Sequence, residues 1–198
     1  MRKALFIGLM VAAATAGCTD TAGPGGGITP TIVGLPAGAP PLYQASVSFY
    51  ALKGEDREGS LYFQDGSGGP GERFARLRVR AGSLLSLPDG TPVNTGDSVL
   101  ITLRVVDLSK LLVELDPAGL KFDPLAPATL ELSYSATGGD LDDDGQVTQA
   151  DSVLAGKLGI WRQETAGAPF VLLLSTRFLD LEEVTAQLNG FSRYALAY

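Results

Sequence analysis

The chain lacks several residue types that common enzymatic chemistries require. It has no histidine, so the commonest general base and the commonest zinc ligand are both absent. Cys18 is the only cysteine, which excludes a disulfide within the chain. Serine and aspartate are plentiful, but neither a G-x-S-x-G nor an S-x-x-K motif occurs. We therefore expect a protein that is not an enzyme, with a hydrolase built on paired carboxylates as a less favoured alternative.

Positive charge is also scarce. The chain has 15 Lys and Arg against 22 Asp and Glu, for a net charge of −7. Loss of an N-terminal segment that contains Arg2 and Lys3 leaves 13 basic and 22 acidic residues, and hence a net charge of −9. Such a surface repels phosphate backbones, which argues against nucleic-acid binding and suits the binding of cations.

The N-terminus resembles a bacterial export signal. Arg2 and Lys3 precede an apolar stretch at residues 4–16, which is too short to span a bilayer as a helix but matches a signal-peptide core. Thr15, Ala16 and Gly17 then lead into Cys18, as in the lipobox of bacterial lipoproteins. The resemblance implies a signal peptide at residues 1–17 and a lipidated Cys18 that anchors the protein in a membrane of the cell envelope, with the outer membrane favoured. The alternative is an ordinary secretory signal cut before Cys18.

Residues 18–41 have the composition of a linker. Residues 19–41 contain six Gly, five Pro and a single charge, Asp20. We expect a flexible tether here, with a strand at Ile32 and Val33 docked on the domain as the alternative.

Residues 42–198 have the pattern of one all-β domain. Hydrophobic residues make up 45% of the chain and charged residues 19%, which is typical of a globular protein. Short β-like runs alternate with turns that are rich in Gly, Pro, Asp and Asn, which predicts an immunoglobulin-like β-sandwich. The predicted strands span residues 45–52, 60–64, 74–80, 84–87, 98–106, 111–115, 128–134, 159–162, 170–175, 184–188 and 192–197.

One helix is predicted, over residues 149–158. Ala150, Val153, Leu154 and Leu158 have helical spacing, and Gly159 is suited to a left-handed C-terminal cap.

A family resemblance involves the segment LVELDPAGLKF at residues 112–122, followed by Pro124 and the ATLEL run at 128–132. This turn between two strands resembles the ZU-five domain of ankyrins, netrin receptors and zonula-occludens proteins. The resemblance implies a non-catalytic β-sandwich that makes protein contacts, with residues 138–158 as an insert.

The strongest chemical signal lies in that insert, at residues 140–151. The segment DLDDDGQVTQAD has acidic residues at positions 1, 3, 5 and 12 and Gly145 at position 6, which matches an EF-hand loop and, because position 12 is Asp, resembles a dockerin repeat. Dockerins carry two such repeats and only one occurs here. Val147 is expected to pin the loop to the core, and Asp143 to point away. The predicted calcium ligands are Asp140, Asp142, Asp144, the Gln146 carbonyl, Thr148 and Asp151.

The same residues have a simpler interpretation as an acidic turn. Thr148 and Asp151 have the spacing of a helix-capping box, which needs no metal. A cap, however, does not require three further aspartates at alternate positions, so we favour calcium.

Two other features are expected to be structural. Arg76, Arg78 and Arg80 alternate with Leu77 and Val79, which predicts the solvent face of a strand. Trp161 is the only tryptophan and is expected in the core, although a sugar-stacking role is the alternative.

These expectations combine into one functional hypothesis. The protein is predicted to be a lipid-anchored interaction or structural module of the envelope with a structural calcium site and an unidentified protein or glycan partner. A carbohydrate-binding or adhesion accessory is the alternative.

The lipid anchor can be tested by phase partitioning in detergent. The mature protein is expected in the detergent phase, and Cys18→Ala in the aqueous phase, because two or three acyl chains hold a protein stably in a membrane. Unchanged partitioning of the variant would contradict lipidation of Cys18.

Overall fold

Residues 29–198 are described by a computed structural model, and the predicted signal peptide, Cys18 and residues 19–28 lie outside the described residues. The described part consists mainly of antiparallel strands, as the all-β prediction requires. Within residues 29–198, no helix combines the length and the apolar character that crossing a membrane would need.

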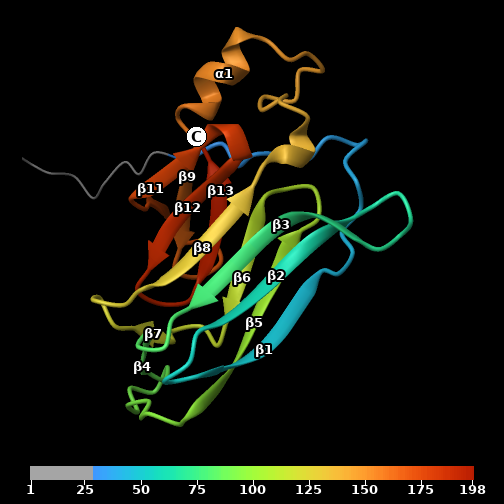
Figure 1. Ribbon diagram of the computed structural model, residues 1–198. Coiled ribbons are helices and arrows are strands. Elements are labelled where there is room, and N and C mark those ends of the chain that lie inside the picture. Colours follow the sequence, from blue (N-terminus) through green and yellow to red (C-terminus); the bar gives the residue numbers. More distant parts are fainter. Residues whose placement is uncertain (1–28) are drawn as a thin grey trace, which may run out of the picture.

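Two large sheets pack face to face (Figure 1). The first sheet has six strands, which in spatial order are β1 (Ser46–Leu52), β5 (Ser98–Asp107), β6 (Leu112–Asp116), β13 (Arg193–Ala197), β9 (Gly159–Gln163) and β10 (Phe170–Leu172). The second has five, in the order β11 (Ser175–Phe178), β12 (Glu183–Leu188), β8 (Ala128–Ser133), β3 (Pro70–Val79) and β2 (Arg57–Gln64).

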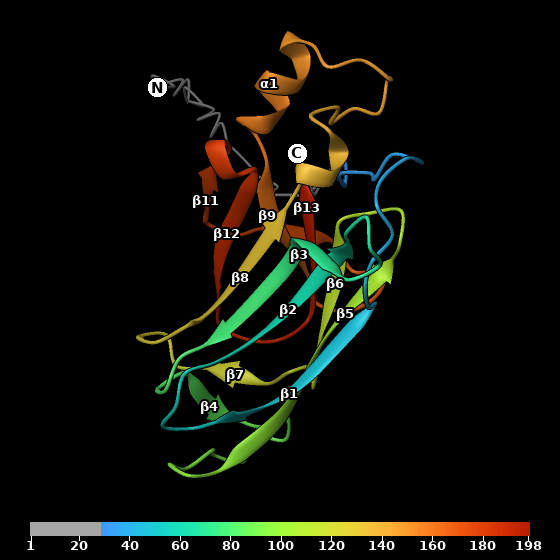
Figure 2. The same ribbon diagram turned by 45° about the vertical axis from the view of Figure 1, so that its right-hand side comes forward.

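The smaller elements lie at opposite ends of the sandwich (Figures 1 and 2). At one end β4 (Leu84–Ser86) pairs with β7 (Lys121–Phe122). At the other end lie the helix α1 (Gln149–Ala155) and the short 3-10 helices η1 (Ser135–Thr137) and η2 (Leu179–Leu181).

Alternating side chains form the core between the large sheets. On β5, Val99, Ile101 and Leu103 are buried, whereas Leu100 between them is half exposed. Phe63 of β2 and Phe74 of β3 meet edge to face with their ring centroids 5.5 Å apart. Burying one such side chain contributes roughly 1.5–3 kcal/mol to folding, so this alternation is sufficient to set which face of each strand turns inward.

Each predicted strand corresponds to an observed one, with changes at the ends. The predicted run at 170–175 is divided between β10 and β11, which belong to different sheets, and β7 was not predicted. The helix was predicted to reach residue 158 with Gly159 as its cap, and this is wrong. The helix ends at Ala155, and Gly159 begins β9, where a Cβ atom would lie 2.6 Å from a Leu172 methyl carbon.

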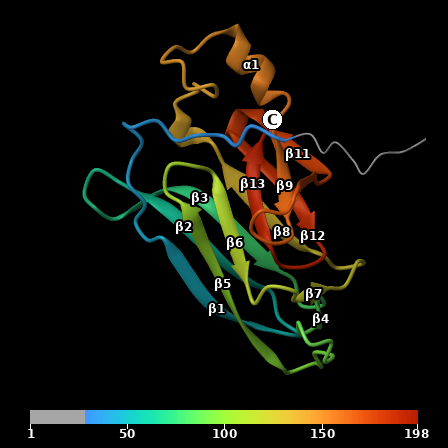
Figure 3. The ribbon, with the colours of Figure 1, turned by 180° about the vertical axis from the view of Figure 1, so that it is seen from behind.

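The linker prediction is wrong for residues 29–41, and the alternative of a docked strand describes them better. The Thr31 and Val33 amides donate to the Tyr198 and Leu196 carbonyls at 2.9 Å, and the Leu111 amide donates to Val33. The Val33 side chain is completely buried. Figure 3 shows this blue segment crossing the end of the sandwich that carries α1. The high Gly and Pro content of this segment favoured a linker, but a few of its apolar residues complete the core.

The docked segment yields a stability prediction. Val33→Ala removes two buried methyl groups and is expected to lower the free energy of unfolding by about 2 kcal/mol, as measured by denaturant titration. Val171→Ala is the matched control, because Val171 is 62% exposed. Equal stability of the two variants would show that residues 29–41 do not pack on the domain.

Candidate metal centre

The acidic loop belongs to a crossing between the two sheets. The chain leaves β8 in the five-stranded sheet, passes through η1, the loop and α1, and enters β9 in the six-stranded sheet. Leu141 within the loop is 4% exposed and Leu158 after the helix is completely buried. The crossing is therefore attached to the core on both sides of the loop.

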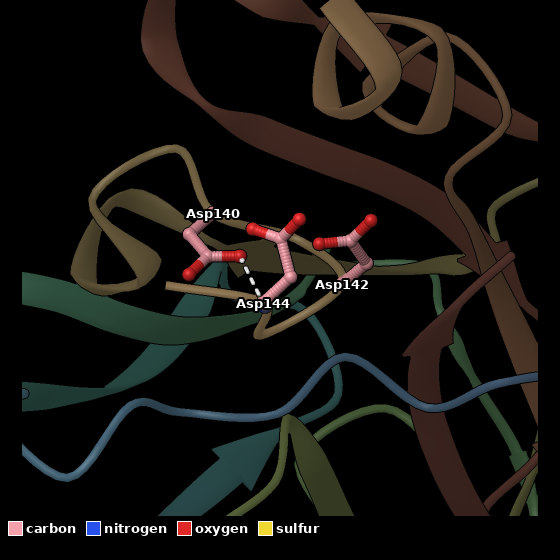
Figure 4. Close-up of side chains that lie close together, drawn as sticks. All are labelled: Asp140, Asp142 and Asp144. Carbon is pink, nitrogen blue, oxygen red and sulfur yellow. Dashed lines mark hydrogen bonds between the residues drawn. The ribbon is translucent and has the colours of Figure 1, made fainter. Parts of the chain in front are cut away.

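Three of the predicted ligands lie together. Carboxylate oxygens of Asp140, Asp142 and Asp144 lie within 4.8 Å of one another, and Figure 4 shows the three carboxylates side by side. Asp140 is half-buried, and Asp142 and Asp144 are exposed. Hard cations such as calcium bind several carboxylate oxygens at short distance, so this group could hold one.

Backbone amides close the loop around Asp140. The Asp144 amide donates to one Asp140 carboxylate oxygen at 3.2 Å (Figure 4). The Gly145 amide donates to the other at 2.8 Å, and the Gln146 amide donates to Asp144 at 2.8 Å. Gly145 has a φ of +84°, a left-handed conformation that glycine adopts without steric cost. This is the sharp turn that the glycine at position 6 of an EF-hand loop provides, and the three carboxylates gather beside it.

The electrostatics of Asp142 reflect this crowding. Desolvation by the surrounding loop, together with the negative charges of Asp144, Asp151 and Asp140, raises the pKa of the Asp142 carboxyl above its usual value. A bound cation would reverse the effect of those charges, because it favours the ionised carboxylates.

Asp151 is not part of the three-carboxylate group and has its own set of hydrogen bonds. Its Oδ2 atom accepts from the Thr148 amide at 2.7 Å, and its Oδ1 atom accepts from the Leu141 amide at 2.8 Å. These bonds lower the pKa of the Asp151 carboxyl, the Thr148 amide having the largest effect. Asp151 is 3% exposed and forms a capping box with Thr148, whose hydroxyl accepts from the Ala150 amide at 3.1 Å.

Asp151 therefore has a structural function whether or not a metal is bound. Each Asp151 carboxylate oxygen has a second lone pair, so its hydrogen bonds do not prevent it from binding a metal. The role of Asp151 as a metal ligand therefore stays a prediction. The same holds for the Gln146 carbonyl and Thr148.

The expectation that Val147 pins the loop to the core is wrong. Val147 is 68% exposed, and Val153 on the helix is 49% exposed. Leu141 is the residue that anchors the loop, and Leu154 and Leu158 are the ones that pack toward the core. A valine followed by an amphipathic helix does not reveal which side of the loop meets the sandwich.

Tyr198 is a neighbour of the loop that sequence reasoning missed. Its hydroxyl donates to the Leu141 carbonyl at 3.4 Å. Burial and the charges of Asp142 and Asp151 raise the pKa of the Tyr198 hydroxyl. Tyr198 lies 57 residues from Leu141 along the chain, so no local pattern could indicate the contact.

Trp161 and the strand that contains Arg76, Leu77 and Val79 make packing contacts, hydrogen bonds or ion pairs within the sandwich. Trp161 is 9% exposed and its indole N–H donates to the Ala197 carbonyl at 3.2 Å, as expected for the core. Leu77 and Val79 are buried, as predicted. Arg76 is only partly exposed and lies 2.6 Å from Glu131 on the neighbouring strand β8, so the arginine row is in part a ladder of ion pairs.

Comparison with known proteins gave no match to a family model, a curated protein or a solved structure.

The capping role of Asp151 can be separated from metal binding. Asp151→Asn replaces one carboxylate oxygen with an NH2 group, which cannot accept a hydrogen bond from the Thr148 or Leu141 amide that it faces. The variant is expected to lower the free energy of unfolding by about 1–3 kcal/mol in chelator. Denaturant titration without calcium measures this loss. Ser152→Asn, at an exposed position of the same helix, is the control. A variant as stable as wild type would show that these hydrogen bonds do not hold the loop.

Proposed function

We propose that the protein is a lipid-anchored, non-catalytic module of the bacterial cell envelope whose β-sandwich is stabilised by calcium. The observation that carries the proposal is the group formed by Asp140, Asp142 and Asp144, gathered within 4.8 Å in a loop that backbone amides close around Asp140.

Calcium is the cation that suits this set of atoms. All the ligands are oxygens, and three carboxylates together with Asp151, the Gln146 carbonyl and Thr148 or a water reach the six or seven that calcium takes. Asp at position 12 is shorter than the usual Glu, which places the affinity in the weak extracellular regime of roughly 10⁻⁴–10⁻³ M. Such affinity is useful in an exported protein, and export is what the lipobox-like end at Cys18 supports.

The ion would act on stability rather than on chemistry. The loop joins the two sheets. Its Leu141 side chain is buried, and the Leu141 amide donates to Asp151 of the helix. Neutralising the carboxylates there favours the folded chain, by about 2.7 kcal/mol at a hundredfold excess of calcium over the dissociation constant.

An interaction or structural module is preferred to a carbohydrate-binding one. Trp161 is buried and its N–H group is already bonded, so it offers no face for stacking on a sugar. The immunoglobulin-like arrangement and the resemblance to the ZU-five family are also part of the proposal, and they rest on the strand pattern and on the turn at residues 116–119.

Thermal melting with calcium and with chelator tests the site. Wild type is expected to melt at a higher temperature in calcium, and Asp142→Ala to lose most of that rise because it removes one of the clustered carboxylates. Asp142 is the best position, since Asp140 and Asp144 also accept the amide bonds that close the loop.

Asp143→Asn is the matched control, because it removes one negative charge from the same loop outside the three-carboxylate group. Asn also tolerates the positive φ of +58° found at this position. It should keep the calcium-dependent rise. Identical melting of wild type in both buffers, with no calcium uptake in calorimetry, would leave the segment as an acidic turn.

A further inference from the structure

One side of the sandwich exposes a group of large apolar side chains. It lies in the segment 170–181, which contains β10, β11 and η2 and has only two charged residues, Arg177 and Asp180. Six of its large apolar side chains are between 44% and 97% exposed. We call this set the apolar edge, and it comprises Val171, Leu172, Leu174, Phe178, Leu179 and Leu181.

The apolar edge closes the same side of both sheets. β10 is the last strand of the six-stranded sheet and β11 is the last of the five-stranded sheet, so a single chain segment borders both. The opposite side is bordered by β1 and β2. Exposed apolar strands at a sheet edge attract other surfaces, and soluble proteins usually protect them with charges or cover them.

The described chain begins beside this edge. Thr29 and Pro30 line one shallow hollow together with Phe170, the first residue of β10. Figure 3 shows the first blue residues reaching the side on which β11 lies. The chain that arrives from Cys18 therefore enters the domain at the apolar edge.

The tether to the membrane is short. Because residues 29–41 are docked, only residues 19–28 separate Cys18 from the domain, and the eleven steps from Cys18 to Thr29 reach about 40 Å at most. A domain of this size has a radius of gyration of about 15 Å and hence a diameter of about 40 Å. A tether of this length keeps the side where the chain enters within reach of the lipid surface.

We propose that the apolar edge rests on the surface of the bilayer in which Cys18 is anchored, with Leu174, which is 97% exposed, inserted among the lipid headgroups. This inference rests on the proposed lipidation of Cys18. The contact is interfacial, so water in the headgroup region satisfies the open backbone groups of β10. The mature chain has a net charge of −9, so the preferred surface is zwitterionic rather than anionic.

Fluorescence from a probe at residue 174 tests the contact. The full lipidated protein carrying Leu174→Cys is labelled with the environment-sensitive dye NBD and reconstituted in phosphatidylcholine vesicles. We expect a blue-shifted emission that headgroup-level spin-labelled lipid quenches. Tyr50→Cys is the control, because Tyr50 is also exposed but lies on β1, which is five strand spacings, or about 24 Å, from β10 across the six-stranded sheet.

The outcomes separate this inference from the anchor itself. Acylation leaves the introduced cysteine as the only reactive thiol, whereas labelling of two thiols and loss of detergent partitioning would show that Cys18 is not lipidated. Anchored protein with the same water-like emission at both positions would overturn the contact alone. A blue shift at residue 174 that lipid quenchers do not reach, and that grows with protein density, would assign the edge to a second copy of the chain instead.

Discussion

The inner faces of the two large sheets share one buried core, and the placement of the other features depends on it. Nearly every strand contributes to this core, from Ala51 on β1 to Leu196 on β13. Because β8 and β9 belong to different sheets, the segment between them has to cross over one end of the core. Leu141 and Leu158 are buried during that crossing, which holds the acidic loop in place from both sides.

That attachment explains how three like charges stay together. Mutual repulsion would open a free loop, but the amides of Asp144 and Gly145 donate to Asp140, and Asp151 joins the loop to the first turn of α1. The dipoles of these amides offset part of the negative charge, and a divalent cation would offset two further unit charges. The same end of the sandwich holds Tyr198 and the docked segment around Thr31, so both ends of the described chain meet close to the loop.

Much of the fold could be predicted because its signals are local. Alternation on β5 and on the Leu77–Val79 pair indicates strands and their buried faces, and the spacing of the aspartates around Gly145 indicates a tight acidic loop. The failures arose where distant parts of the chain decide the outcome. Val33 looked like part of a linker because its partners, Leu111 and Leu196, are far away in the sequence. Gly159 looked like a helix cap because its close neighbour Leu172 lies on another strand.

The sequence by itself determined the all-β class, most strand positions and the gathering of Asp140, Asp142 and Asp144, since strand periodicity and loop closure act over a few residues. Only the tertiary structure decided that Leu141 rather than Val147 anchors the loop. It also decided that Asp151 accepts hydrogen bonds as part of a helix cap, and that the segment 170–181 borders both sheets. These outcomes depend on how the two sheets pack around their common core, and that packing follows from the shapes of all the buried side chains together.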